Sequence, residues 1–362
     1  MNLSDLRDEL TTRADGLAPA RDLRAGVVAR VRATKQRRAA VAGSVATLMV
    51  AALAVGAVSS LDRPVVRTPA GTPSSPAPMV GDDGMPYRVI PDSPGDVVKD
   101  GLRYRRQVAD DRLAVGFIGD RGQGQFSLLW EPTTTHVSLG AECYLPGLTN
   151  AEAAKYLVTV GLEGKKGFLA NQCSGRRPAE RDLPAGGAVP GEPGRGWTEL
   201  AVGRSARLRV QLVDAETQRP ASVDSAQLTG VVYELGAQTR IVDASGTTVA
   251  SLPKVIEHQG YPYRFLAMEA APADRNPMPS LETPARVPFM VTAGVTGSDA
   301  SSHPGTVYVT GLDQKSGATS GGWQTLPQPA RAAGRVGLQS EGAAPLGTAF
   351  VATYVLDTSP TP

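Results

Sequence analysis

The chain has 362 residues, with 37 Lys and Arg against 35 Asp and Glu and a formal net charge of +2. This length leaves room for two folded domains of ~100 to 200 residues each. Residues 1–38 hold nine basic and five acidic side chains, so the rest of the chain has 28 basic against 30 acidic side chains, a net charge of −2. A nearly neutral remainder excludes the basic surface that nucleic-acid binding needs, so no nucleic-acid partner is expected.

The first 38 residues predict a short helical leader. Leu3, Leu6 and Leu10 recur at helical spacing after Ser4, which is suited to cap the helix. A second helical stretch begins at about residue 21. A segment of fewer than ~40 residues cannot bury a core unaided, so the leader is not a domain. The three leucines are candidate contacts for a partner protein.

Residues 39–58, AAVAGSVATLMVAALAVGAV, contain no charge and predict one transmembrane helix. At ~1.5 Å rise per residue this helix spans about 30 Å, the hydrocarbon thickness of a bilayer. Five basic side chains precede it, at positions 30, 32, 35, 37 and 38. By the positive-inside rule, the N-terminus is expected in the cytoplasm and the C-terminal domains outside the plasma membrane of a single-pass protein.

A cleaved signal peptide is the alternative for this segment, because Val55-Gly56-Ala57 supplies small residues near its end. A long leader and an apolar run that exceeds the usual ~7 to 15 residues favour the retained anchor. Small residues also recur every fourth position on one face of the span, at Ala39, Gly43, Thr47 and Ala51. This pattern allows close helix approach, although an alanine-rich span also produces it by chance.

The opening sequence, MNLSDLRDELTTRADGLAPARDLRAGVVARVRATKQRRAAVAG, resembles the cytoplasmic leader of actinobacterial single-pass membrane proteins, some of which are anti-sigma factors. The resemblance covers about the first sixty residues. It implies a cytoplasmic regulator, such as a sigma factor, as partner of the leader. Zinc-type anti-sigma factors carry a His-x-x-x-Cys-x-x-Cys motif here, whereas this leader has neither His nor Cys, which puts that activity in doubt.

Residues 59–97 predict an extended stalk outside the membrane, since eight prolines fall between residues 62 and 97. The hydrophobic period then changes to two, as in residues 136–145 and 206–214. The fold expected is mainly β, with two tandem antiparallel β-sandwiches at 98–220 and 221–358; immunoglobulin-like and jelly-roll-like layouts both fit. One helix is expected at about 150–157, where Thr149 and Glu152 form a capping box.

Cys143 and Cys173 are the two cysteines of the chain, and both follow the predicted span. An even count in an oxidising compartment predicts one disulfide; two buried reduced thiols are the alternative. Three scattered histidines, at 136, 258 and 303, form no ligand-spaced set with them, so neither a metal nor another cofactor is expected.

No catalytic residues are predicted, and the chain is not expected to be an enzyme. Ser251-Leu252-Pro253-Lys254 matches the Ser-x-x-Lys of penicillin-recognising acyl enzymes, but a proline inside the required helix and missing partner motifs oppose it. The adjacent carboxylates Asp110 and Asp111 are interpreted as solvated turn residues rather than an acid–base pair.

Four aromatic residues are the candidate ligand or partner contacts: Tyr261, Tyr263, Trp197 and Trp323. The alternative for a tryptophan in a sandwich is a place in the core. Together the segments predict a membrane-anchored bacterial cell-surface protein whose β modules bind a cell-wall glycan or a surface protein. The alternative function is a single-pass signalling or anti-sigma-like regulator whose leader contacts a sigma factor.

Overall fold

The computed structural model describes residues 79–165, 167–178, 180–191, 194–297, 306–312, 322–342 and 345–358. These residues belong to one compact unit, Pro76–Pro362. The predicted leader with its three leucines, the predicted span and the stalk up to residue 78 lie outside the described residues. Within the described part, no helix combines the length and the apolar character needed to cross a membrane.

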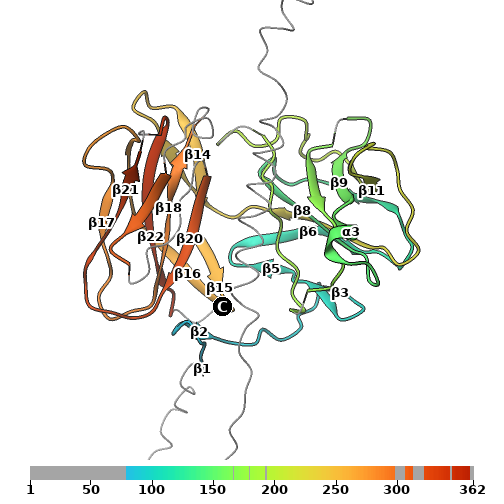
Figure 1. Cartoon of the computed structure of the whole chain (residues 1–362), viewed down its shortest axis with the longest axis horizontal. Helices are drawn as coiled ribbons and strands as arrows, with labels where there is room; N and C mark the ends of the chain where they lie inside the picture. The colour runs from blue at the N-terminus through green and yellow to red at the C-terminus, as the bar shows by residue number, and fades with distance from the viewer. Residues whose placement is uncertain are drawn as a thin grey trace, which may run out of the picture. The chain divides into compact units, whose positions relative to one another are not determined.

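The described part is mainly β, built from several antiparallel sheets, which confirms the predicted fold class at that level (Figure 1). A first set of strands forms two four-stranded sheets, in the orders β10-β9-β11-β7 and β5-β6-β12-β8, and a hairpin of β3 and β4. Their bounds are β3 Val97–Lys99, β4 Leu102–Tyr104, β5 Gln107–Val108, β6 Asp111–Ile118, β7 Gln125–Trp130, β8 Val137–Tyr144, β9 Tyr156–Leu162, β10 Leu169–Gln172, β11 Ala206–Asp214 and β12 Gln227–Glu234.

One cluster of buried apolar side chains draws on both four-stranded sheets. Leu139 from β8, Val158 from β9 and Leu208 from β11 are all fully buried in it. The predicted period of two is visible in β11, where Leu208, Val210 and Leu212 face this cluster and the alternating Arg207 and Arg209 are exposed. Burial of these side chains is the main source of stability for the first set.

The remaining strands form a second set, with sheet orders β15-β16-β22-β18-β20, β17-β21-β19 and β13-β14. A further hairpin, β1 (Met79–Val80) with β2 (Pro86–Tyr87), begins the described part. The bounds of the second set are β13 Gln238–Val242, β14 Thr248–Pro253, β15 Val255–His258, β16 Tyr261–Pro272, β17 Ser280–Glu282, β18 Phe289–Thr296, β19 Thr306–Thr310, β20 Gly322–Gln328, β21 Arg335–Glu341 and β22 Thr348–Leu356.

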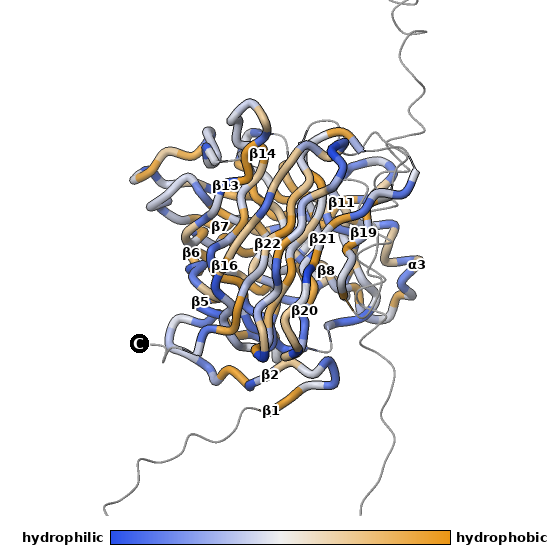
Figure 2. The backbone as a smooth tube through the Cα atoms, turned by 90° about the vertical axis from the view of Figure 1, so that its left-hand side faces the viewer, coloured by the Kyte–Doolittle hydropathy of each residue, from blue (hydrophilic) through white to orange (hydrophobic). Residues whose placement is uncertain are grey.

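The central strand β18 is buried along its whole length, because its two faces enter different clusters. Val291 and Ala293 pack with β21 and β19 residues such as Val336 and Val307, whereas Met290 packs with Tyr354 and the β13–β14 hairpin. In Figure 2 hydrophobic colour predominates along β22, the strand that pairs with β18. A continuous apolar run is the pattern expected for a strand covered on both faces.

The strand pairing bears on the predicted division into residues 98–220 and 221–358, which stays a prediction. Strand β12 pairs with β6 and with β8, so it belongs to the first set although it follows residue 221. The two sets meet in the sequence at the connection between β12 and β13, which comprises residues 235–237.

The predicted helix is present but shorter than expected: α3 covers Asn150–Ala153. Its capping box is confirmed, with Thr149 accepting from the Glu152 N–H and Glu152 accepting from Thr149. The chain enters β9 at Tyr156 because the following residues pair with β11 and β10. Tertiary strand pairing therefore overrides helix propensity in the second half of the predicted helix.

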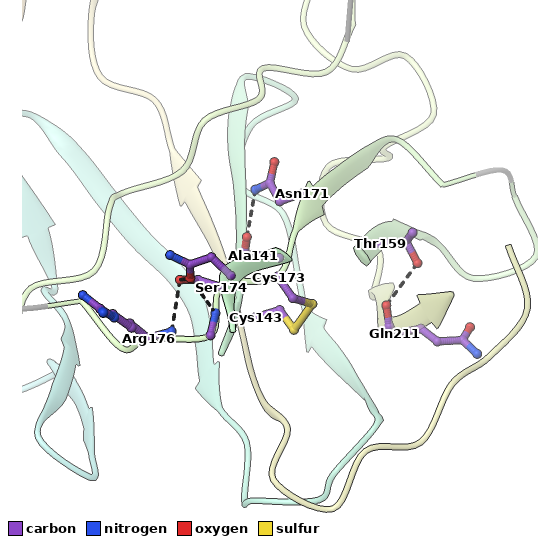
Figure 3. The surroundings of a disulfide bond; sticks show 10 residues. Ala141, Cys143, Thr159, Asn171, Cys173, Ser174, Arg176 and Gln211 are labelled. Atoms are coloured by element: carbon purple, nitrogen blue, oxygen red, sulfur yellow. Dashed lines mark hydrogen bonds between the residues drawn. A yellow bond between two sulfur atoms is a disulfide. The ribbon is translucent and has the colours of Figure 1, made fainter. Parts of the chain in front are cut away.

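The predicted disulfide is confirmed, between Cys143 on β8 and Cys173 directly after β10, with Cα atoms 4.6 Å apart (Figure 3). Both cysteines are buried, and the Ser174 N–H donates to the Cys143 carbonyl at 2.9 Å. The Asn171 side chain donates to the Ala141 carbonyl, also at 2.9 Å. The bridge and these bonds join an outer strand of one four-stranded sheet to an outer strand of the other.

Candidate functional site: a polar cluster between the strand sets

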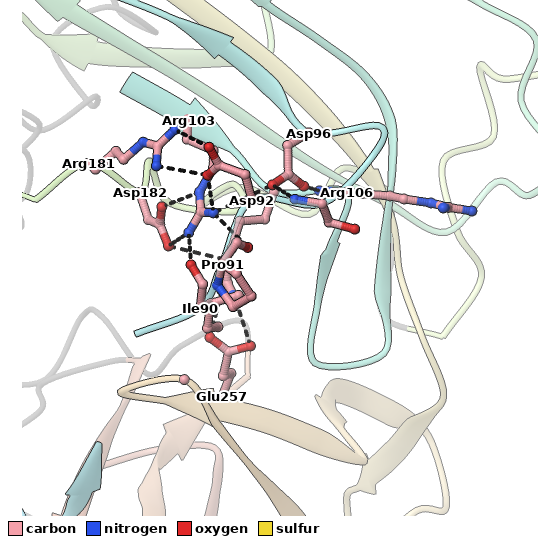
Figure 4. Close-up of polar contacts among 12 residues, drawn as sticks. Ile90, Pro91, Asp92, Asp96, Arg103, Arg106, Arg181, Asp182 and Glu257 are labelled. Carbon is pink, nitrogen blue, oxygen red and sulfur yellow. Dashed lines mark hydrogen bonds and ion pairs between the residues drawn. The ribbon is translucent and has the colours of Figure 1, made fainter. Parts of the chain in front are cut away.

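The most extensive polar cluster of the described part surrounds Arg103 on β4, whose side chain is only 3% exposed. Its guanidinium donates twice to Asp182, once to Asp92 and once each to the carbonyls of Ile90 and Pro91, over 2.7–3.0 Å (Figure 4). An arginine has five N–H donors, and all five are used here. Arg103 therefore has no donor left for a ligand.

Acidic side chains balance the charge of this guanidinium. Asp182 contacts it bidentately, Asp92 is 2.8 Å from it, and the buried carboxylate of Asp96 lies 3.5 Å away. Hydrogen bonding to Asp182 and the neighbouring carboxylates raise the pKa of Arg103 against the effect of burial. The hydrogen bond from Arg181, with the charges of both arginines, lowers the pKa of Asp92. Both shifts favour the charged forms of Arg103 and Asp92 at neutral pH.

A second arginine ties the cluster to the other strand set. Arg105, just after β4, donates to both oxygens of Glu257 on β15 at 2.6 and 3.0 Å. The Ala109 N–H donates to Glu257 as well, at 3.4 Å. Because Arg105 is 11% and Glu257 15% exposed, this bidentate pair is largely shielded from water and from salt.

The segment before β3 is held by both strand sets. From the first set, Arg103 donates to the Ile90 and Pro91 carbonyls of this segment. On the side of the second set, the Arg88 side chain donates at 2.7 Å to the carbonyl of Gly260, which lies in the turn between β15 and β16. The Arg88 guanidinium also lies over the Tyr261 ring, 5.0 Å from its centre. The cluster is therefore best described as a structural latch whose charged groups are satisfied by one another.

The adjacent acids Asp110 and Asp111 hold the connection between the two strand sets. Asp111 accepts from the Gly236 N–H at 2.8 Å and Asp110 from the Ala237 N–H at 2.9 Å. Burial, assisted by the charge of Asp110, raises the pKa of Asp111 from 3.8 to about 6, against the lowering effect of the Gly236 bond. The sequence interpretation of both as solvated turn residues was incomplete, since the chain folds residues 235–237 over them.

The raised pKa of Asp111 predicts a pH-dependent stability. Between pH 4 and 6 the folded state binds the proton more tightly than the unfolded state, so the free energy of unfolding falls as pH rises through this range. Asp111→Asn keeps an acceptor for the Gly236 N–H without the charge, and we expect it to stabilise the protein by about 1–2 kcal/mol at pH 7.5. Urea unfolding of the wild type and of Asp111→Asn at pH 4.5 and 7.5 measures this stabilisation, which should be smaller at pH 4.5. An equal stabilisation at both pH values would contradict the raised pKa of Asp111.

The four predicted aromatic contacts lie in different surroundings. Tyr263 is fully buried and Trp197 is 4% exposed, so both are part of the cores. The Trp197 indole donates to Glu199, and its ring lies 5.9 Å from that of Phe168. Trp323 on β20 is 43% exposed with one edge against Phe350. The exposed Trp323 and the half-buried Tyr261 are the two of the four that present surface to a ligand.

The other motifs from the sequence acquire structural context. Ser251 lies within strand β14 and Lys254 directly follows it, so the helical turn that brings serine and lysine together in acyl enzymes is absent at this position. In the described part, no group of three or more His, Cys, Asp or Glu side chains is placed to hold a metal ion. No protein-family model matches the chain, and no curated protein matches it significantly in sequence.

Sequence reasoning did not identify the Arg103 cluster. The acids that surround Arg103 come from residues 92, 96 and 182, and no local pattern connects them. The local pattern in β4 indicated an exposed side chain, because a charged residue between two apolar ones in a strand normally points to solvent. The same alternation in β11 does place its arginines at the surface.

Proposed function

We propose that this chain is a single-pass membrane protein whose β modules lie outside the plasma membrane and bind a partner without catalysing a reaction. The observation that carries the proposal is the buried Cys143–Cys173 disulfide, because structural disulfides form and persist in oxidising compartments. It supports the orientation expected from the basic residues before the span, which puts residues 59–362 on the outer side.

The β modules are proposed to be two sandwiches of immunoglobulin-like or jelly-roll-like type. Support comes from the shared core of the two four-stranded sheets in the first set, and from the two clusters that cover β18 in the second. Sandwiches of this type serve as binding scaffolds in many unrelated proteins, so the function depends on their surfaces.

The binding surface is proposed to include Trp323, and its ligand to be a cell-wall glycan or a protein at the cell surface. An exposed indole on a rigid strand offers a flat apolar face suited to stacking on a sugar ring. Phe350 contacts the indole in an edge arrangement, with ring centres 5.9 Å apart, and this contact limits the motion of the indole before a ligand arrives.

A sedimentation assay tests this binding role. Full-length protein in detergent is mixed with purified cell-wall material, and the bound fraction is compared for the wild type and Trp323→Ala. We expect wild-type binding and an about tenfold weaker Kd for Trp323→Ala, corresponding to the loss of one stacking contact. Trp197→Phe is unsuitable as a control because Trp197 is buried; Leu266→Ala, at an apolar side chain that is 52% exposed, should bind like the wild type. Absence of wild-type binding to wall glycans and surface proteins alike would refute the binding role.

A further inference from the structure

Strand β7 is an open edge of its sheet, since it pairs with β11 on one side and with no other strand of the described part. The Leu212 N–H donates to the Gly124 carbonyl, in register with this ladder. Hydrogen-bonded pairs alternate along an antiparallel ladder, so Phe126 and Leu128 direct their backbone groups to β11. The backbone N–H and C=O groups of Gln125, Ser127 and Leu129 therefore point to the open side, and no backbone bond within the described residues takes them.

Three other edge strands, β20, β8 and β15, carry features that oppose further pairing. Strand β20 contains Pro327, which cannot donate a ladder bond, and the edge of β8 is covered by backbone bonds between Leu139 and Ala188. Strand β15 has four residues, of which two are Glu257 and His258. By contrast β7, with the sequence QFSLLW, has neither a charge nor a proline. Natural proteins usually protect an edge of this kind.

Apolar side chains are exposed along this open edge. Leu129 is 56% exposed, and Phe117 on the neighbouring strand β6 is 36% exposed. The centre of the Phe117 ring lies 4.7 Å from that of Phe126 on β7, so this side chain packs beside the edge strand although β6 belongs to the other four-stranded sheet. A paired strand on β7 would satisfy the three pairs of backbone groups and cover part of this apolar surface.

We propose that the partner on this edge is β7 of a second copy, paired antiparallel about a two-fold axis at Ser127. This register places Ser127 opposite Ser127 and Gln125 opposite Leu129, so all the open backbone groups of both strands pair. Two four-stranded sheets then become one continuous sheet. An uncharged edge suits itself as a partner, because no like charges face each other across the axis.

A second observation supports a copy of the same chain as the occupant. The row Ala39, Gly43, Thr47 and Ala51 on the predicted span is suited to helix self-association. This argument rests on the proposed membrane anchoring. Two copies held in one membrane have a high effective concentration for each other, so a weak pairing of six-residue strands is sufficient.

Site-directed cross-linking of the full chain, reconstituted into bilayers, tests the pairing. Directly opposed residues have Cβ atoms ~4.5 to 5.5 Å apart, so Ser127→Cys is expected to give a covalent dimer with a short bifunctional thiol reagent. The matched control is Ala170→Cys, an exposed position on β10 at the opposite edge of the same sheet. We expect about tenfold less dimer from Ala170→Cys; equal yields would overturn the proposal.

Ser127→Lys provides an independent variant, because it sets two ammonium groups opposite each other at the axis. It should weaken dimerisation about tenfold by mass photometry, while a urea-unfolding midpoint equal to that of the wild type shows that the chain has folded. A monomeric wild type would overturn the proposal. A dimer of the same affinity in the wild type and in Ser127→Lys would also overturn it, because the contact between copies would then lie in the span. Cross-linking of Ser127→Cys to a different protein would also overturn it and identify β7 as a docking strand for a foreign peptide. If the chain purifies without membranes, the anchoring fails, and the same assays in solution still decide the pairing.

Discussion

Cys143→Ser is expected to lower the free energy of unfolding by about 2–5 kcal/mol. The bridge closes a loop between residues 30 apart in the sequence, worth ~3.5 kcal/mol in the chain-entropy model. Its loss also leaves a buried serine hydroxyl in the apolar cluster around Leu139, which adds to the cost. Guanidinium unfolding, followed by tryptophan fluorescence, measures the change. The first strand set should lose most of this stability, because both cysteines belong to it.

The double variant Cys143→Ala/Cys173→Ala separates the bridge from the buried hydroxyl. A reducing agent should destabilise the wild type by about as much as this double replacement and leave the variant itself unchanged. The intact oxidised chain should also be two hydrogen atoms lighter than the reduced chain. Rapid alkylation of both thiols in unreduced, folded protein would contradict the disulfide.

Arg103→Met should destabilise the protein by about 3–5 kcal/mol, because it removes the positive partner from a cluster of carboxylates. Asp182 loses two hydrogen bonds, and Asp96, whose side chain is 3% exposed, loses the guanidinium 3.5 Å away. The carbonyls of Ile90 and Pro91 lose their donors as well, which frees the segment before β3. Urea unfolding of the purified chain measures the loss.

Arg181→Gln is the matched control, because Arg181 binds the same Asp92 carboxylate as Arg103 at the same 2.8 Å but is 44% exposed. An exposed ion pair contributes little, so the expected loss is below about 1 kcal/mol. Arg103→Lys should also destabilise, since one ammonium group cannot replace a five-donor fork. Similar small losses for Arg103→Met and Arg181→Gln would show that the latch contributes no more than a surface pair.

Local sequence patterns were sufficient for the strands predicted at residues 136–145 and 206–214 and for the cap of α3. They failed where distant segments cover a strand. In β8 the alternation of Val137, Leu139 and Ala141 indicated one buried face, but the whole strand apart from Glu142 is buried. Residues 185–188 lie on its other face, and a Cβ on Gly140 would come within 2.8 Å of the Gly186 backbone. No pattern within residues 137–144 records that contact.

The candidate contacts show the same limit. Gly260 and Pro262, which flank Tyr261, are residues typical of a loop, yet the candidate contact Tyr263 is within the long strand β16 and fully buried. The exposure of Trp323 and the open edge of β7 depend on which strands lie at the sheet borders. Border positions follow from the pairing of all strands, a property that hydrophobic period alone does not determine.

Cysteine-accessibility labelling tests the central claim, that the β modules lie outside the membrane, most directly. A single cysteine is introduced in the stalk at Ser75, and intact cells are treated with a membrane-impermeant maleimide. The claim predicts labelling of the full-length chain before lysis, with no labelling of a cysteine introduced at Ala14 in the leader until the cells are opened. Labelling at Ser75 only after lysis would reverse the orientation, and a mature N-terminus near Val58 would show that the span is cleaved rather than retained.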